Sequence, residues 1–374
     1  MPNQGQFLRQ IATVLLTCGL SACLLPGLAA AQDESTADNQ WGPGYRITPN
    51  GVRIDGIRAT NPTNRVIWDD DMYSESKQIC WTYVNAQAKL GRLDLRGAIM
   101  TYAESNQQTW QRQIDGYNFY RDLMRDSGLT TVPDTFIAGA RQRLVRPASG
   151  RIEDTQYRLS DGARFIIQQA DASTTDNPLI VFVGGQATTV ATAILERPDI
   201  ANRMIVFSLS SIPVGWNGKD EWASHIAARR APHISFGRQT HAMGGDKAAW
   251  EGTPNNPLIN YLRNGFLALH DGGPVAWYFN QHLVTGAQRR IMVGDGNRKS
   301  ISSDGIYVGS QPMEVKDVNT NPYGHLYMGH TGPKNSVHNP DNGLNHTKLY
   351  RAMVAVLKDP RVWDPDYSAK SVPK

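Results

Sequence analysis

The chain has 374 residues, of which 40% are hydrophobic and 19% are charged, and its formal net charge is +4. This length suits one large α/β domain or two smaller ones, and the composition is ordinary for a globular protein. The net charge is small for the length and the sequence contains no block of lysines or arginines, so a nucleic-acid-binding face is not indicated.

The N-terminal residues read as a secretory signal peptide. A short N-terminal segment with one arginine precedes an apolar run, and small residues follow that run. This pattern predicts cleavage after Ala31 and a periplasmic or secreted mature chain. Residues 20–23 also fit a lipoprotein box, and in that alternative Cys23 is lipidated and anchors the chain to a membrane. An uncleaved membrane anchor is a further alternative, although Pro26 and Gly27 interrupt the apolar run.

Residues 32–62 are polar and rich in Asn, Gly, Pro and Asp, which predicts a flexible N-terminal arm with one short strand within residues 44–56. A single domain is expected from residue 63 to residue 374. Once the signal peptide is removed, Cys80 is the only cysteine, so no internal disulfide can form. Cys80 lies in an apolar helical stretch, and we expect a buried space-filling residue there rather than a nucleophile.

From Arg65 onward the sequence alternates between strand and helix patterns. An apolar run at 65–68, a helical pattern at 77–91 and a second strand at 93–102 make a βαβ unit. Continuous apolar runs at 177–185 and 203–211 enclose another helix, as expected of strands buried on both faces. Further helices are expected at 109–128 and 158–172, and a helix with a strand at 219–237. The pattern predicts an α/β fold, a single domain with a mostly parallel, Rossmann-like sheet flanked by helices.

Three consecutive aspartates, Asp69, Asp70 and Asp71, stand at the end of the first buried strand. In an open parallel sheet, ligands bind at the carboxyl ends of the strands. Carboxylates this close repel one another unless a cation offsets their charge, and Ca²⁺ takes several oxygen ligands. The alternative is a solvated acidic turn that caps the following helix, since acidic residues are favoured near helix N-termini.

The acidic run and later stretches, in this order, resemble the nucleoside hydrolase superfamily of the inosine–uridine-preferring type. The run resembles the family's apolar strand followed by Asp-x-Asp-x-x-x-Asp-Asp, and "GGQATTVATA" (184–193), "WNGKDEWA" (216–223) and "HDGGPVAWYF" (270–279) resemble its later motifs. The resemblance covers residues 65–280. It implies a nucleoside hydrolase-like fold and hydrolysis of the N-glycosidic bond of a ribonucleoside or related N-riboside.

The resemblance also implies roles for individual residues. The residues that would hold Ca²⁺ are Asp69, Asp71, Thr188 through its carbonyl, and Asp271. Asp71 would take a proton from the attacking water, and His270 would act as an acid near the leaving base. Glu75 and Asn217 would hold the ribose.

The motif departs from the family pattern at its end. Ser76 stands where the family has its last motif aspartate, and Glu75 stands where it has the preceding one. We therefore hypothesise that the fold is kept while the Ca²⁺ site is weakened or rebuilt. Two alternatives stay open at this point: His270 is an ordinary surface histidine, and the domain is a non-catalytic protein that binds a nucleoside or carbohydrate.

A rival interpretation is a haloacid dehalogenase-like phosphatase, in which Asp69 would be phosphorylated with Mg²⁺ present. Its Gly-Asp-Gly stretch would lie within residues 291–300, but Tyr73 replaces the expected Thr or Val and the later Asp is absent. On either enzymatic interpretation the partner is a small molecule. For the favoured nucleoside hydrolase interpretation, it is a nucleoside or a sugar-like substrate. We expect no nucleic acid, and no membrane unless Cys23 is lipidated. A homo-oligomer remains open because the resembled family is often oligomeric.

Overall fold

The computed structural model describes twelve stretches of the chain, all within the compact unit Trp41–Lys374. These are residues 46–48, 51–53, 64–71, 78–101, 110–209, 220–236, 247–264, 272–280, 306–308, 311–313, 325–328 and 346–369. The expected signal peptide lies outside the described residues, so the boundaries of signal peptide, arm and domain stay predictions.

A seven-stranded sheet forms the centre of the described structure, with the strand order β11-β8-β7-β6-β3-β4-β5 and every neighbouring pair parallel. The strands are β3 (Arg65–Asp70), β4 (Asp94–Met100), β5 (Ile137–Ala138), β6 (Leu179–Val183), β7 (Met204–Leu209), β8 (His233–Phe236) and β11 (His325–Met328). The expected parallel, Rossmann-like sheet is confirmed. Within this sheet the first strand in chain order is β3; the next two strands lie outward to β5, and the following strands lie on the other side of β3.

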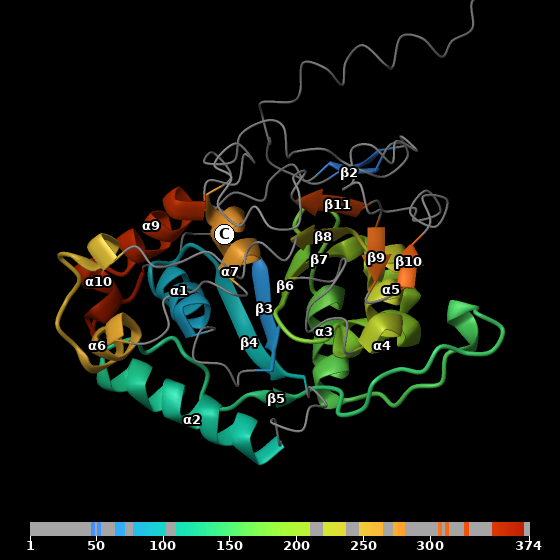
Figure 1. Ribbon diagram of the computed structural model, residues 1–374, viewed down its shortest axis with the longest axis horizontal. Helices are drawn as coiled ribbons and strands as arrows, with labels where there is room; N and C mark the ends of the chain where they lie inside the picture. The colour runs from blue at the N-terminus through green and yellow to red at the C-terminus, as the bar shows by residue number, and fades with distance from the viewer. Residues whose placement is uncertain are drawn as a thin grey trace, which may run out of the picture. The chain divides into compact units, whose positions relative to one another are not determined.

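Helices cover both faces of this sheet (Figure 1). One face carries α1 (Gln78–Lys89), α2 (Trp110–Asp126), α6 (Pro257–Asn264), α7 (Gly272–Phe279), α9 (His346–Val356) and α10 (Pro360–Trp363). The other carries α3 (Asp161–Asp171), α4 (Thr188–Glu196) and α5 (Glu221–Arg230). Short 3-10 helices lie at η2 (Ile152–Asp154), η3 (Pro198–Arg203) and η6 (Lys247–Trp250). The helices expected from the sequence pattern are therefore confirmed.

Side chains of the central strands alternate between two hydrophobic clusters. On β3, Val66 and Trp68 belong to the cluster under α1 and α7, whereas Ile67 belongs to the cluster under α3 and α4. Successive residues of a strand point to opposite faces, so a strand covered on both faces needs an unbroken apolar run. The run "RVIW" meets this requirement up to the point where the aspartates begin.

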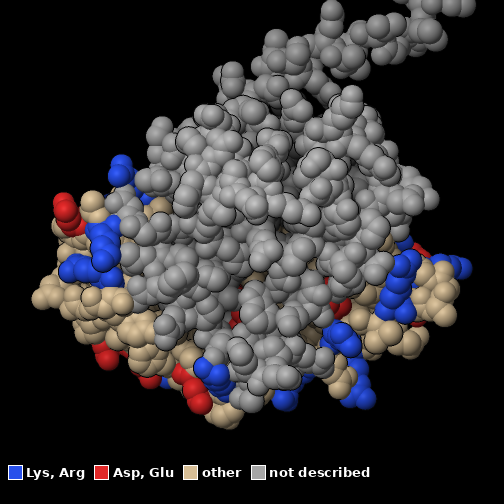
Figure 2. All heavy atoms as spheres, in the orientation of Figure 1, with Lys and Arg blue, Asp and Glu red and all other residues tan. Residues whose placement is uncertain are grey.

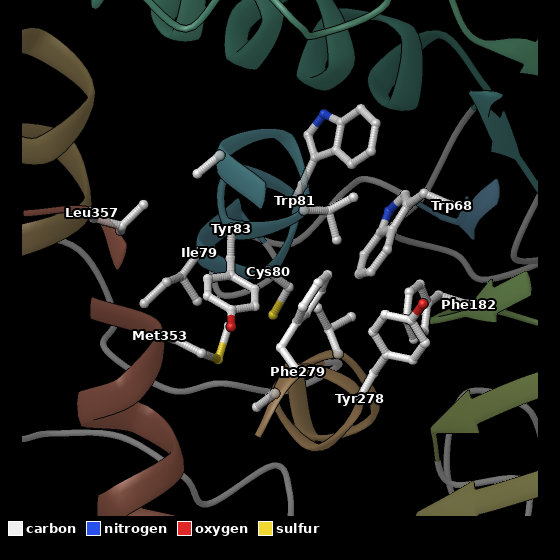
Figure 3. Close-up of a cluster of buried hydrophobic side chains, with 14 of the residues drawn as sticks. Trp68, Ile79, Cys80, Trp81, Tyr83, Phe182, Tyr278, Phe279, Met353 and Leu357 are labelled. Atoms are coloured by element: carbon white, nitrogen blue, oxygen red, sulfur yellow. The ribbon is translucent and has the colours of Figure 1, made fainter. Parts of the chain in front are cut away.

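Aromatic rings fill much of the cluster between the sheet and α1 and α7 (Figure 3). Trp68 stacks on Trp81 with ring centroids 5.9 Å apart, and Phe182 meets Tyr278 edge-on at 5.5 Å. Such pairs add about 0.5–1.5 kcal/mol each beyond the area they bury. Cys80 is fully buried among these rings, as expected of a space-filling cysteine.

Two small antiparallel pairs complete the described strands. β1 (Arg46–Thr48) pairs with β2 (Gly51–Arg53), so the arm contains two strands where the sequence suggested one. β9 (Ile306–Val308) pairs with β10 (Gln311–Met313). Within the described residues, no helix has both the length and the apolar character needed to cross a membrane. In the view of Figure 2, lysine and arginine side chains are interspersed with aspartate and glutamate side chains over the described part of the surface.

Gly128 ends α2 and allows close contact with α10. Its φ of +92° lies in the left-handed region, and a Cβ there would lie 2.0 Å from the Trp363 carbonyl oxygen. Gly252 has a similar φ of +77°, but a Cβ there would meet nothing within 4 Å. A side chain at Gly252 would therefore cause backbone strain alone, whereas a side chain at Gly128 would cause strain and a steric clash.

We expect Gly128→Ala to lower the free energy of unfolding by more than ~2 kcal/mol, because strain and clash add. Gly252→Ala should cost only about 1 kcal/mol, from strain alone. Urea unfolding followed by tryptophan fluorescence measures both. Equal losses would show that the close contact with α10 contributes nothing.

Candidate functional site

The strand order creates a switch point between β3 and β6. β3 hydrogen bonds to β4 on one side and to β6 on the other, with Asp69 opposite Ile99 of β4 and Val183 of β6. The helices that follow β3 and β6, α1 and α4, lie on opposite faces of the sheet, and ligands bind at such points in open α/β sheets. The three aspartates thus lie at the position where this topology favours a ligand.

Asp69, Asp70 and Asp71 are all fully buried. This rules out the solvated acidic turn, because none of the three carboxyls faces water. Burial raises the pKa of Asp69 well above its usual value, and the hydrogen bond from Thr101 lowers it in part. The neighbouring charge of Asp70 raises that pKa further. Holding such groups ionised requires hydrogen-bond donors or a cation close by.

A chain of hydrogen-bond donors leads to Asp69. The Thr101 hydroxyl, just after β4, donates to Asp69 Oδ1. The Thr101 and Thr189 hydroxyl oxygens are 2.6 Å apart, and the Ala140 N–H donates to Thr189 Oγ1 at 2.9 Å. Because Thr101 gives its only proton to Asp69, Thr189 must donate to Thr101. Every proton in the chain therefore points toward the carboxylate.

Asp70 faces the opposite side of the strand and contacts the turn after β6. Its Oδ1 accepts the N–H of Asp71 at 2.7 Å. The Gly184 N–H donates to the Asp69 carbonyl at 2.9 Å, and a Cβ on Gly184 would lie 2.8 Å from Asp70 Cγ. Glycine is thus required at Gly184 for the backbone of the turn to approach the acidic run.

Thr188 begins α4 and is held by a residue that the sequence interpretation missed. Its hydroxyl donates to Asp220 Oδ2 at 2.6 Å, and its carbonyl accepts the Thr192 hydroxyl at 2.7 Å. Asp220 is buried, caps α5 through the Ala223 N–H, and also accepts the Leu144 N–H. Burial raises the pKa of Asp220, and these donors lower it. An acid directly before a helical pattern is the sequence feature that could have identified this cap.

Gln186 is a second residue that the sequence interpretation missed. It follows the Gly184–Gly185 turn and is 2% exposed. Neither atom of its side-chain amide forms a hydrogen bond with the described residues. A buried amide is costly unless its donors and acceptor are satisfied, so Gln186 is a candidate for contact with a polar ligand.

The described residues fit calcium in donor type but not in number. Asp69 Oδ2 is buried and accepts no hydrogen bond from the described residues, and carboxylate oxygens are the donors that Ca²⁺ prefers. Among the residues that the structure describes, no three His, Cys, Asp or Glu side chains form a metal-binding group. The other site residues implied by the sequence lie outside the described stretches, namely Glu75, Asn217, His270 and Asp271.

The fold is that of solved nucleoside hydrolases. The purine-preferring ribonucleoside hydrolase from Gardnerella vaginalis matches with a TM-score of 0.53 and 14% identity, over 79% of this chain and 100% of that one. An inosine–guanosine nucleoside hydrolase matches with a TM-score of 0.51 and 11% identity, over 78% and 99%. No family model and no curated protein matches the sequence. At these identities the likeness establishes the fold, and it favours the nucleoside hydrolase interpretation of the fold over the phosphatase one.

The donor chain to Asp69 can be tested with an isosteric change. Thr101→Val removes the hydroxyl that serves both Asp69 and Thr189, so we expect a loss of about 1–3 kcal/mol in the free energy of unfolding. Thr192→Val is the matched control, since its hydroxyl donates only to a helical carbonyl that the α4 backbone also serves. The control should lose less than about 1 kcal/mol in urea unfolding. Similar losses in both variants would contradict a special role for Thr101.

Proposed function

We propose that this chain is an N-glycosyl hydrolase that cleaves a ribonucleoside or a related N-riboside. The observation that carries the proposal is the burial of Asp69, Asp70 and Asp71 at the switch point, against the Gly184 turn. Cleavage of an N-glycosidic bond develops positive charge on the sugar, and a carboxylate-lined crevice stabilises that charge. The nucleoside hydrolase fold supports the same reaction class.

Each residue at the switch point is proposed to have a separate role in the reaction. The donor chain through Thr101 fixes Asp69 and leaves its Oδ2 for a ligand. Asp71 follows the strand and is proposed as the group that takes a proton from the attacking water. Gln186 is proposed to bind a hydroxyl of the sugar. When bound, Ca²⁺ supplies a positive charge that offsets the carboxylates and holds sugar hydroxyls.

The remaining assignments rest on the motif resemblance. Asp69, Asp71 and Asp271 are proposed to hold the metal, with His270 near the leaving base and Glu75 and Asn217 at the ribose. The Thr188 carbonyl, which the resemblance also implied as a ligand, instead accepts the Thr192 hydroxyl within α4. Action in the periplasm or outside the cell is proposed from the N-terminal signal. A binding protein without catalysis is the second candidate, because Ser76 replaces a motif acid and the described residues supply no three-acid group.

Release of reducing sugar from inosine and uridine tests the reaction. We expect the mature protein to release ribose, and Asp71→Asn to lower the rate by roughly 10²-fold or more, as expected for loss of a catalytic base. Asp115→Asn, an exposed acid on α2, should leave the rate unchanged. Binding of inosine without release of sugar would favour the binding protein. An unchanged rate in Asp71→Asn would exclude Asp71 as the base.

Calcium dependence is a separate measurement. Isothermal titration of Ca²⁺ into the chelator-treated mature protein should show saturable binding that Asp69→Asn and Asp71→Asn both weaken by at least about tenfold, since each removes one charge from the site. Asp115→Asn again serves as the control for a general charge effect. Equal Ca²⁺ affinity in all variants would remove calcium from the proposal and leave the carboxylates to act without it.

A further inference from the structure

The segment after β5, residues 139–149, is strongly basic. It reads "GARQRLVRPAS" and contains Arg141, Arg143 and Arg146 but no acidic residue. All three arginines are exposed. We call residues 139–149 the rim segment, and Figure 1 shows it leaving β5 along the lower part of the view.

The rim segment is attached to the edge of the sheet that carries the aspartates. Its first residues continue β5 beyond the carboxyl end, where the Ala140 N–H donates to Thr189 in the chain that ends on Asp69. Further along, the Leu144 N–H donates to Asp220 Oδ2, the cap of α5. The segment therefore passes the N-termini of α4 and α5. Three consecutive hydrogen bonds separate its backbone from the Asp69 carboxylate.

The three rim arginines form no salt bridge with a described carboxylate. The Arg141 guanidinium lies over the Trp110 ring at 4.7 Å, and that of Arg146 lies over Trp222 at 5.4 Å. The charge of Arg143 helps to lower the pKa of the buried Asp220 carboxyl, without a salt bridge between the two. Nine other described arginines pair with acids, namely Arg96, Arg121, Arg125, Arg151, Arg164, Arg197, Arg203, Arg230 and Arg361. Arg65, Arg92 and Arg263 instead donate to neutral side chains. The ring contacts of Arg141 and Arg146 are therefore what distinguish them from these three.

An arginine stacked on an aromatic ring is held in place while its N–H groups stay available at the edge of the guanidinium plane. That arrangement suits bidentate binding of a phosphate. Holding Arg141 on Trp110 also reduces the entropy lost when a ligand binds. An exposed arginine that serves only solubility needs no such ring contact.

We infer that the rim segment binds the phosphate of a phosphorylated N-riboside, with the sugar in the carboxylate crevice and the phosphate on Arg141 and Arg143. This inference rests on the proposed function for the sugar half of the ligand. The placement keeps the anionic group away from the three aspartates and next to unneutralised positive charge. A neutral nucleoside would use the crevice alone and leave the arginines without a role.

Binding of inorganic pyrophosphate tests the rim without depending on catalysis. Isothermal titration at low ionic strength should give saturable binding that Arg141→Gln/Arg143→Gln weakens by at least about tenfold. The matched control is Arg151→Gln/Arg164→Gln, which removes the same charge from arginines that already pair with acids. The control should keep its affinity within about twofold. No binding to the wild type, or equal losses in both variants, would overturn the inference.

A second experiment distinguishes binding of free phosphate from binding of a phosphate attached to a nucleoside. Uridine 5′-monophosphate should bind at least about tenfold tighter than uridine, and Arg141→Gln/Arg143→Gln should abolish that difference while leaving uridine binding unchanged. Pyrophosphate binding with no preference for the nucleotide would limit the rim to free phosphate and overturn the substrate class. Failure of both uridine compounds to bind, with pyrophosphate still bound at the rim, would contradict the proposed function instead.

Discussion

Burial of three consecutive aspartates at the end of the central strand is the constraint around which this site is built. Removing one ionised carboxylate from water costs several kcal/mol even after relaxation, and the mutual repulsion of Asp69 and Asp70 adds to that cost. A sequence that served only stability would place apolar residues there, as it does at Val66–Trp68. The acids are tolerated because the structure supplies donors, and they stand at the switch point, where open α/β sheets bind ligands.

The donors come from three separate parts of the chain. Thr101 follows β4, Thr189 lies in the first turn of α4, and Ala140 follows β5. Parallel strands bring these points together because their carboxyl ends share one edge of the sheet. On the other side of β3, the Gly184 turn lies so close to Asp70 that any side chain at Gly184 would clash with it. The same contacts that satisfy Asp69 therefore also hold the strand ends together at the switch point.

The sequence predicted the parts of the fold that local pattern controls. β3, β6 and β7 are unbroken apolar runs, and α2 and α3 show clear helical spacing, so strand and helix types were recoverable. β5, with two residues, and β11, which comes from the loop-like stretch at 323–332, have too little local signal. Their strand character depends on pairing with β4 and β8, which is a tertiary effect. The run Asp69–Asp71 was identified correctly as the feature of interest, although a solvated turn could not be excluded without knowledge of burial.

The rest of the site could not be read from the sequence because it depends on contacts between distant residues. Thr101 and Thr189 are 88 positions apart, and nothing local marks either hydroxyl as a partner of Asp69. Asp220 reads as an ordinary helix cap, yet it also fixes Thr188 and the rim segment. Gln186 stands out only once its burial is known.

The charges around the crevice follow an arrangement that a net charge of +4 conceals. Carboxyl groups are buried at the end of β3, while arginines that form no salt bridge with a described carboxylate lie on the exposed rim segment a few hydrogen bonds away. Under the proposed function, such a separation would draw an anion to the rim and a developing cation to the carboxylates. A sugar phosphate carries both features in one molecule when its glycosidic bond breaks. Because the buried carboxylates are shielded from salt and the rim is not, ionic strength should weaken recognition of the phosphate more than binding of the sugar.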